Sequence, residues 1–208
     1  MIRSNHAIPW FSQWLSTYDL SRGRIVVHLP AAGGRLHQLK PLILAMVDMC
    51  ERNRIAIEFH VTSGDGRRTA EEEDAGYFSD ISVYGIDAFF VIERSANLHC
   101  YSSPMHKYAH RIIVRRTDVL AIDDIDDLSK VDIILFSLSP ERGLQTGGRW
   151  DRNILDAINQ ELNENGLVIR TCNDRNMSPL FTMLTSPKIQ IGTPYNWYDV
   201  WQRKEHDK

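Results

Sequence analysis

The sequence predicts an α/β protein with a mostly parallel sheet of seven strands, a C-terminal antiparallel hairpin and helices on both faces. Apolar runs of strand length alternate with helical patterns along the chain. The run at 131–138 is apolar on both faces, as a central parallel strand is, and the last two expected strands are joined by a Gly-Thr-Pro turn. With no repeat or linker in its 208 residues, the chain is expected to form a single domain, 1–208, in which 1–54 adds helices and an extra strand to a core sheet in 55–208.

Composition excludes several classes of protein. Hydrophobic residues make up 43% and charged residues 25%, the balance of an ordinary soluble globular protein. The first residues lack the apolar region of a signal peptide, so an intracellular protein, cytoplasmic or nuclear and not secreted, is expected. The three cysteines lie far apart and the histidines lack metal-ligand spacing, so no metal site is expected. A net charge of −3 neither requires nor excludes nucleic acid.

The first elements are a helix, a strand and a second helix. Residues 8–20 place aromatic side chains at helical spacing, which indicates a helix that docks on the protein itself or on a partner, rather than a ligand site. A strand at 25–29 is followed by a loop. Pro41 suits the first turn of the next helix, whose apolar run covers 42–49.

The strand at 55–61 leads directly into a glycine turn at 63–66. Glycines at the carboxyl end of a strand let the backbone approach a ligand in the crevice where α/β sheets bind small molecules. An ordinary β-turn is the alternative.

The remaining elements follow from the same patterns. The acidic run at 69–75 suits the first turn of a helix, and an apolar helical face at 151–163 ends at Asn165-Gly166. Further strands are expected at 88–93, 111–114, 131–138, 167–171, 188–191 and 195–201.

Five short motifs carry a family resemblance: GRLHQLK at 34–40, SGDGRRTA at 63–70, TDV at 117–119, VDII at 131–134 and NGLVIRT at 165–171. In this order they resemble the methyltransferase domain in the large polymerase protein of non-segmented negative-strand RNA viruses. More distantly, they are similar to the bacterial heat-shock ribosomal RNA 2′-O-methyltransferases. The resemblance spans about residues 33 to 204. It implies a Rossmann-like class I methyltransferase fold, S-adenosylmethionine as cofactor, capped RNA as substrate and other domains of a larger polymerase chain as partners.

The catalytic residues that the resemblance implies depart from the family pattern. The Lys-Asp-Lys-Glu tetrad of these enzymes falls on Lys40, Ser137 and Arg170, and its glutamate has no good match near Trp197 and Asp199. Arginine is not deprotonated in a protein and cannot activate a 2′-hydroxyl. The resemblance implies methyl transfer either to a ribose 2′-oxygen or to guanine N7 of the capped RNA. Guanine N7 is already nucleophilic and needs mainly positioning, so methyl transfer to N7 is less affected by these changes.

The resemblance also implies a cofactor site at the ends of several strands. The turn residues Ser63, Gly64, Asp65 and Gly66 approach the methionine part and the ribose, Glu93 binds ribose hydroxyls and Asp118 lies beside the adenine. The structural alternatives are a Glu93 paired with Arg94 or Arg116 at the surface, and an Asp118 that caps a turn.

Basic residues beside these loops are the candidates for RNA binding, because Lys and Arg neutralise phosphates. Besides Lys40 they are Arg35, His37, Arg67, Arg68, Arg142 and Arg149. Trp150 or Tyr195 could stack a base. The alternative is that these charges are simply solvated on loops.

Three functions remain open from the sequence. The first is an active RNA cap methyltransferase, favoured by the glycine turn and Lys40. The second is a methyltransferase-like module that has lost its chemistry and binds RNA or acts as a scaffold, favoured by Ser137 and Arg170. A nucleotide-sugar-dependent transferase is a distant third, suggested by the strand, glycine pair and helix at 25–49.

Overall fold

The structure is a computed structural model that describes residues 8–30, 36–62, 86, 89–95, 98–115, 130–136, 158–170, 181–184, 189–190 and 197–204. Two helices and ten strands are defined within these ranges. They are α1 (Pro9–Thr17), β1 (Arg24–Pro30), α2 (Leu36–Arg52), β2 (Ala56–Thr62), β3 (Phe90–Arg94), β4 (Leu98–Ser102), β5 (Arg111–Arg115), β6 (Val131–Phe136), β7 (Leu162–Arg170), β8 (Phe181–Met183), β9 (Ile189–Gln190) and β10 (Trp197–Arg203).

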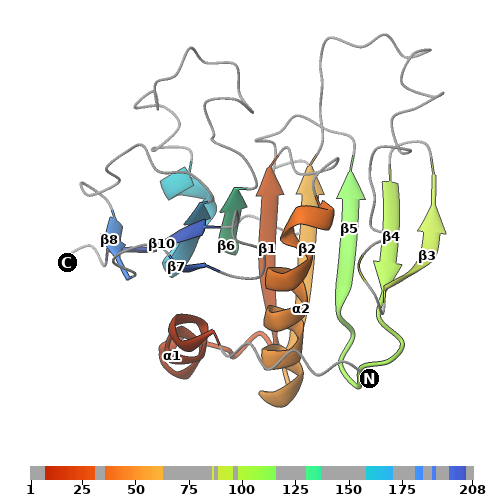
Figure 1. The fold of residues 1–208 in the computed structure, drawn as a ribbon, viewed down its shortest axis with the longest axis horizontal. Helices are drawn as coiled ribbons and strands as arrows, with labels where there is room; N and C mark the ends of the chain where they lie inside the picture. Colours follow the sequence, from red (N-terminus) through yellow and green to blue (C-terminus); the bar gives the residue numbers. More distant parts are fainter. Residues whose placement is uncertain are drawn as a thin grey trace, which may run out of the picture.

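The strands form a mixed sheet in the order β3-β4-β5-β2-β1-β6-β7-β10-β8 (Figure 1). β9 pairs with β10. Its centre, β5-β2-β1-β6-β7, is parallel throughout. Antiparallel strands flank this centre at both edges. The parallel centre and the hairpin of β9 with β10 are as predicted. The predicted number of seven strands is wrong, because the described residues contain ten strands, of which β4 and β8 were not expected.

β1 lies at the middle of the sheet. The sequence instead predicts it as an extra strand, added to a core sheet that begins at residue 55. It pairs in parallel with β2 on one side and β6 on the other. Both β1 and β6 are buried along their length, apart from the first residue of β1. Strand order depends on contacts between distant segments, so a count along the chain cannot give it.

β3 is an edge strand, although its apolar run predicted a core strand at 88–93. It pairs with β4, and the side chains of Phe90, Val91 and Ile92 are all exposed. An apolar sequence indicates a strand but does not tell how many neighbours cover it.

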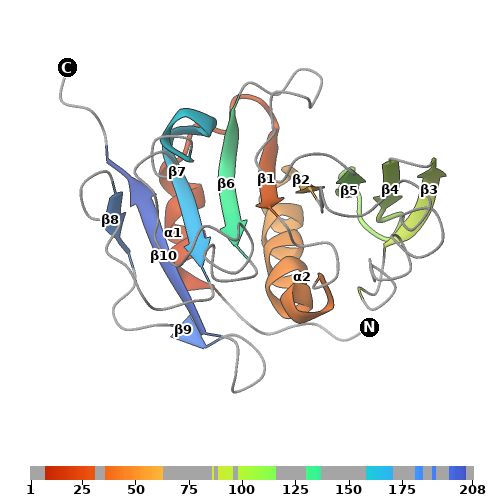
Figure 2. The same ribbon diagram turned by 90° about the horizontal axis from the view of Figure 1, so that it is seen from above.

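Helices contribute to the cores on the two faces of the sheet. On the first face, α1 and α2 pack against residues such as Val27, Phe59 and Ile169. On the second face, Ile158, in the helical residues 158–161, packs with Val26, Val168 and Trp201. Figure 2 shows α1 and α2 beside the strands that they cover. α2 begins at Leu36, so Pro41 lies inside the helix and not in its first turn as predicted.

The aromatic residues of α1 pack against the sheet of the same chain. Trp10, Phe11 and Trp14 are buried, and Trp14 stacks on Phe11 and Tyr18. The indole Nε1 of Trp14 donates a hydrogen bond to the carbonyl oxygen of Asn165, 2.8 Å away. The partner-surface interpretation of this stripe is therefore wrong, and docking on the protein itself is confirmed.

A buried carboxylate fixes the amino end of the parallel centre. Asp132 of β6 accepts hydrogen bonds from the Tyr18 hydroxyl (2.6 Å), the Val26 backbone N–H (2.8 Å) and the Asn163 side-chain amide (2.6 Å). Burial, followed by the neighbouring Asp132 carboxylate, raises the pKa of Tyr18 well above its usual value, so the phenol stays a donor. Asp132 thus joins the residue after α1 to β1, β6 and the start of β7.

Candidate functional site

The parallel centre reverses its order between β1 and β6. From β1 the sheet extends to β2 and β5 on one side, and to β6 and β7 on the other. Open α/β sheets bind ligands in the crevice outside the carboxyl ends of the two strands at such a switch point. These ends are Pro30 and Phe136. The predicted site is instead centred on the turn after the neighbouring strand, β2, and the glycine pair after β1 enters only the distant third function.

Most of the predicted site residues lie outside the described residues. These are Arg35, Ser63, Gly64, Asp65, Gly66, Arg67, Arg68, Asp118, Ser137, Arg142 and Arg149. His37 belongs to α2, but its side chain is not described. Lys40, Glu93 and Arg170 are the three whose side chains the structure describes.

Glu93 lies far from the switch point. It is exposed on β3, opposite Cys100 of β4. β3 is four strands from β1, which corresponds to roughly 19 Å at the usual strand spacing. The placement agrees with the structural alternative, a residue of a surface strand, better than with a ribose-binding acid.

Arg170 is held by a partner that the sequence analysis left unassigned. It ends β7, and Asp199 of β10 lies directly opposite in the sheet. The guanidinium donates two hydrogen bonds to the carboxylate, one of them from Nε to Oδ1 at 2.8 Å and the other from Nη2 to Oδ2. Its Cζ lies 5.4 Å from the centre of the Trp201 ring. The signal available in the sequence was an acid, Asp199, among aromatic residues near the C-terminus. That this acid pairs with Arg170 follows only from the register of β7 and β10.

Lys40 and Arg170 approach the sheet from opposite faces. α2 packs on the first face through residues such as Leu39 and Ile43, beside Ile169 of β7. Arg170 follows Ile169, and successive side chains of a strand alternate between faces. Its contact with Trp201 accordingly lies on the second face. The two described members of the expected tetrad are therefore not brought together.

A polar row crosses β1 and β2 on the second face, and the sequence analysis missed it. His28 is fully buried, with Nδ1 2.5 Å from Oε1 of Glu161 and Nε2 2.8 Å from the hydroxyl oxygen of Thr62. His60, the register partner of His28, accepts a hydrogen bond at Nδ1 from Arg115. Thr62 ends β2, so the row reaches the carboxyl edge of the sheet. Its signal was a histidine in each of two adjacent buried strands.

Burial and a neighbouring charge perturb two groups on this face. Burial lowers the pKa of His60, and the His60 imidazole, whose Nε2 lies 3.6 Å from Oε2 of Glu58, lowers the pKa of that carboxyl. Within the described ranges, no three His, Cys, Asp or Glu side chains are grouped as metal ligands. No described helix is long and apolar enough to span a membrane.

Comparison with known proteins gives a distant structural likeness. No protein-family model and no curated protein sequence matches the chain. Among solved structures, the chain is similar to the N-methyltransferase NodS from Bradyrhizobium japonicum WM9, with a TM-score of 0.41, 12% sequence identity and 94% of each chain covered. A likeness at this level carries no inference about function. Function is therefore inferred from the strand order of the sheet and not from this likeness.

Proposed function

We propose that this chain is an S-adenosylmethionine-dependent methyltransferase-like domain that acts on RNA. The observation that carries the proposal is the strand order β5-β2-β1-β6-β7 with antiparallel β10 beside β7. The parallel part has the order of a doubly wound nucleotide-binding sheet, with the crevice at β1 and β6. The antiparallel C-terminal strand agrees with the class I methyltransferase architecture that the sequence motifs resemble. Glycine-containing segments follow β1, which borders that crevice, and β2, its neighbour in the sheet.

RNA as the substrate rests on the resemblance and on the basic residues beside the expected loops. Within that proposal, guanine N7 is a better acceptor for the methyl group than a ribose 2′-oxygen. Transfer to a 2′-hydroxyl needs a group that removes its proton. Arg170 occupies the position expected for the activating lysine, but it does not lose a proton and is paired with Asp199. N7 carries no proton, so positioning alone supports transfer.

The second candidate is a module that keeps the cofactor fold without catalysis. Two observations on the expected catalytic residues favour this second candidate. The charge of Arg170 is neutralised by Asp199, and Lys40 lies on the other face of the sheet. A module of this kind binds the cofactor or RNA and transfers no methyl group.

The test is calorimetric titration of the chain with S-adenosylmethionine and S-adenosylhomocysteine, followed by transfer assays. Two capped RNAs serve as substrates, one unmethylated at guanine N7 and one already methylated there. We expect cofactor binding and transfer to the first RNA alone. Binding without transfer to either RNA favours the second candidate. Absence of binding to both the cofactor and the capped RNAs refutes both candidates, and binding of a nucleotide sugar then favours the distant third function.

A matched pair of variants tests the cofactor turn. Asp65→Arg reverses a charge in the turn that the sequence predicts after β2 and is expected to abolish cofactor binding. Glu164→Arg makes the same kind of change at an exposed position near the amino end of β7, at the opposite edge of the sheet, and should leave binding unchanged. Equal affinity in both variants would exclude the proposed turn.

A further inference from the structure

Four buried side-chain nitrogens on the second face have no hydrogen-bond partner among the residues that the structure describes. Nη1 of Arg170 and Nε1 of Trp201 belong to two side chains in contact with each other, and the other two nitrogens are Nε2 of His60 and Nε of Arg203. Arg170 is 1% exposed and Trp201 is 5% exposed, so solvent does not reach the greater part of either side chain. Natural proteins keep few buried donors without an acceptor, because an unmet donor is destabilising. An acceptor supplied by a ligand accounts for the adjacent pair, Arg170 Nη1 and Trp201 Nε1.

The surroundings of Arg170 hold its guanidinium in one orientation. Asp199 accepts hydrogen bonds from Nε and Nη2, and the Trp201 ring lies against the guanidinium. These contacts leave the two N–H bonds of Nη1 unused, next to the side chain that carries the second unpartnered donor. A fixed set of donors of this kind suits a group with several acceptor oxygens.

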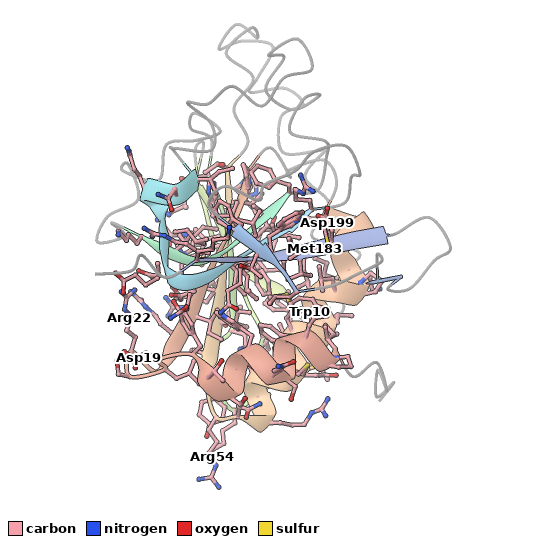
Figure 3. The ribbon with its side chains drawn as sticks, turned by 90° about the vertical axis from the view of Figure 1, so that its left-hand side faces the viewer. Trp10, Asp19, Arg22, Arg54, Met183 and Asp199 are labelled. Atoms are coloured by element: carbon pink, nitrogen blue, oxygen red, sulfur yellow. The ribbon has the colours of Figure 1, made fainter. Side chains whose placement is uncertain are left out.

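The pair lies where a ligand can be expected. Arg170 is the last residue of β7, and Asp199 is near the start of the antiparallel β10, so both are at the carboxyl edge of the parallel centre. Figure 3 shows Asp199 in the upper part of the sheet, above Trp10 of α1. Trp10 Nε1 is also an unpartnered buried donor, but it belongs to the first-face core. The Trp10 donor therefore offers a control of identical chemistry on the opposite face of the sheet.

We propose that Arg170 and Trp201 form a binding site for a phosphate group. The three free N–H bonds, two on Nη1 and one on Nε1, match the multiple acceptor positions of phosphate oxygens. Asp199 acts as a positioning residue that presents the guanidinium. That the phosphate belongs to an RNA backbone rests on the proposed function, whereas binding of phosphate itself does not.

The experiment uses the indole N–H resonances of the five tryptophans in ¹⁵N-labelled protein. Trp201→Phe and Trp10→Phe each delete one resonance and so assign it. Inorganic phosphate is then titrated at constant ionic strength, with chloride as the matched anion. We expect a saturable shift of the Trp201 resonance and no shift of the Trp10 resonance. A Trp201 resonance that does not move, or moves equally with chloride, overturns the site.

Affinity of the variants for inorganic phosphate provides the second measurement. Trp201→Phe keeps the ring and removes one donor, so affinity should fall about 5- to 10-fold, while Trp10→Phe leaves it unchanged. Arg170→Lys keeps the charge and loses the planar fork, and should weaken binding at least about 10-fold. Unchanged affinity in both Trp201→Phe and Arg170→Lys overturns the site. If one of these variants fails to fold, the wild-type titration and the other variant decide.

A third arm separates this site from the proposed function. A short single-stranded RNA is compared with the same sequence carrying a neutral methylphosphonate backbone, and S-adenosylmethionine is titrated separately. A Trp201 shift with natural RNA alone supports a backbone phosphate as the ligand. A shift with inorganic phosphate but with neither RNA nor cofactor keeps the site and refutes the proposed function. Cofactor binding without any phosphate shift keeps the function and refutes the site.

Discussion

Replacing Asp132 by alanine should remove a large part of the stability of the fold. The substitution deprives three donors of their acceptor: the Val26 backbone N–H, the Tyr18 hydroxyl and the Asn163 amide. The Val26 hydrogen bond is buried, and a buried donor left unpaired costs about 1–3 kcal/mol. The two partly buried hydrogen bonds contribute about 0.5–1.5 kcal/mol each, so the expected loss is about 2–6 kcal/mol. Domains are stable by only about 5–15 kcal/mol.

Urea unfolding followed by tryptophan fluorescence measures this loss, because Trp14 stacks on Tyr18 beside the carboxylate. Tyr18→Phe removes a single hydrogen bond and should cost about 1 kcal/mol. Asp132→Asn keeps one acceptor oxygen and should fall between the two. The double variant Tyr18→Phe/Asp132→Ala should be no less stable than Asp132→Ala alone, because the hydroxyl has then already lost its acceptor. A loss below about 1 kcal/mol for Asp132→Ala would refute the network as the anchor of β1.

Three further predictions concern packing, pH and the cofactor. Gly166→Ala should cost at least about 1–3 kcal/mol, because its Cβ would lie 2.8 Å from the Asp132 carbonyl oxygen and 2.9 Å from that of Asn163; an unchanged urea midpoint contradicts this. Burial lowers the pKa of His110, whose Nδ1 accepts the Ile57 N–H, so stability should be complete above about pH 6.5 and fall as the pH drops from there toward that lowered pKa. His110→Asn should flatten that fall in urea midpoints measured from pH 5 to 7.5, and an equal slope in both proteins counts against it. Under the proposed function, Glu93→Gln should leave the calorimetric affinity for S-adenosylmethionine unchanged, and a loss of 10-fold or more would return Glu93 to the site.

The C-terminal segment shows why part of the candidate site was accessible from sequence and part was not. Arg170 was named from the NGLVIRT motif, which is local in the sequence. Its acid, Asp199, is 29 residues further along and meets it through the antiparallel register of β7 and β10. A shift of that register by one residue would turn the carboxylate to the first face. No local pattern contains this information.

The parallel centre was predictable because each of its strands contains an apolar run of strand length. β6 is buried along its whole length, whereas β2 alternates between apolar and polar residues and β5 between buried and less buried ones, and both patterns indicate a strand. Helix α2 is similarly indicated by its apolar periodicity. For these elements, local residue choice and final environment agree.

Only the tertiary structure decided the order of the strands and the neighbours of the polar residues. It placed β1 at the switch point, moved Glu93 to an exposed edge, and separated Lys40 from Arg170 by the thickness of the sheet. It also joined His28 with Thr62 and Glu161, which lie 34 and 133 residues away. Strand pairing between distant segments sets these neighbours, so the sequence determined which segments form the sheet, and the fold determined which side chains meet on it.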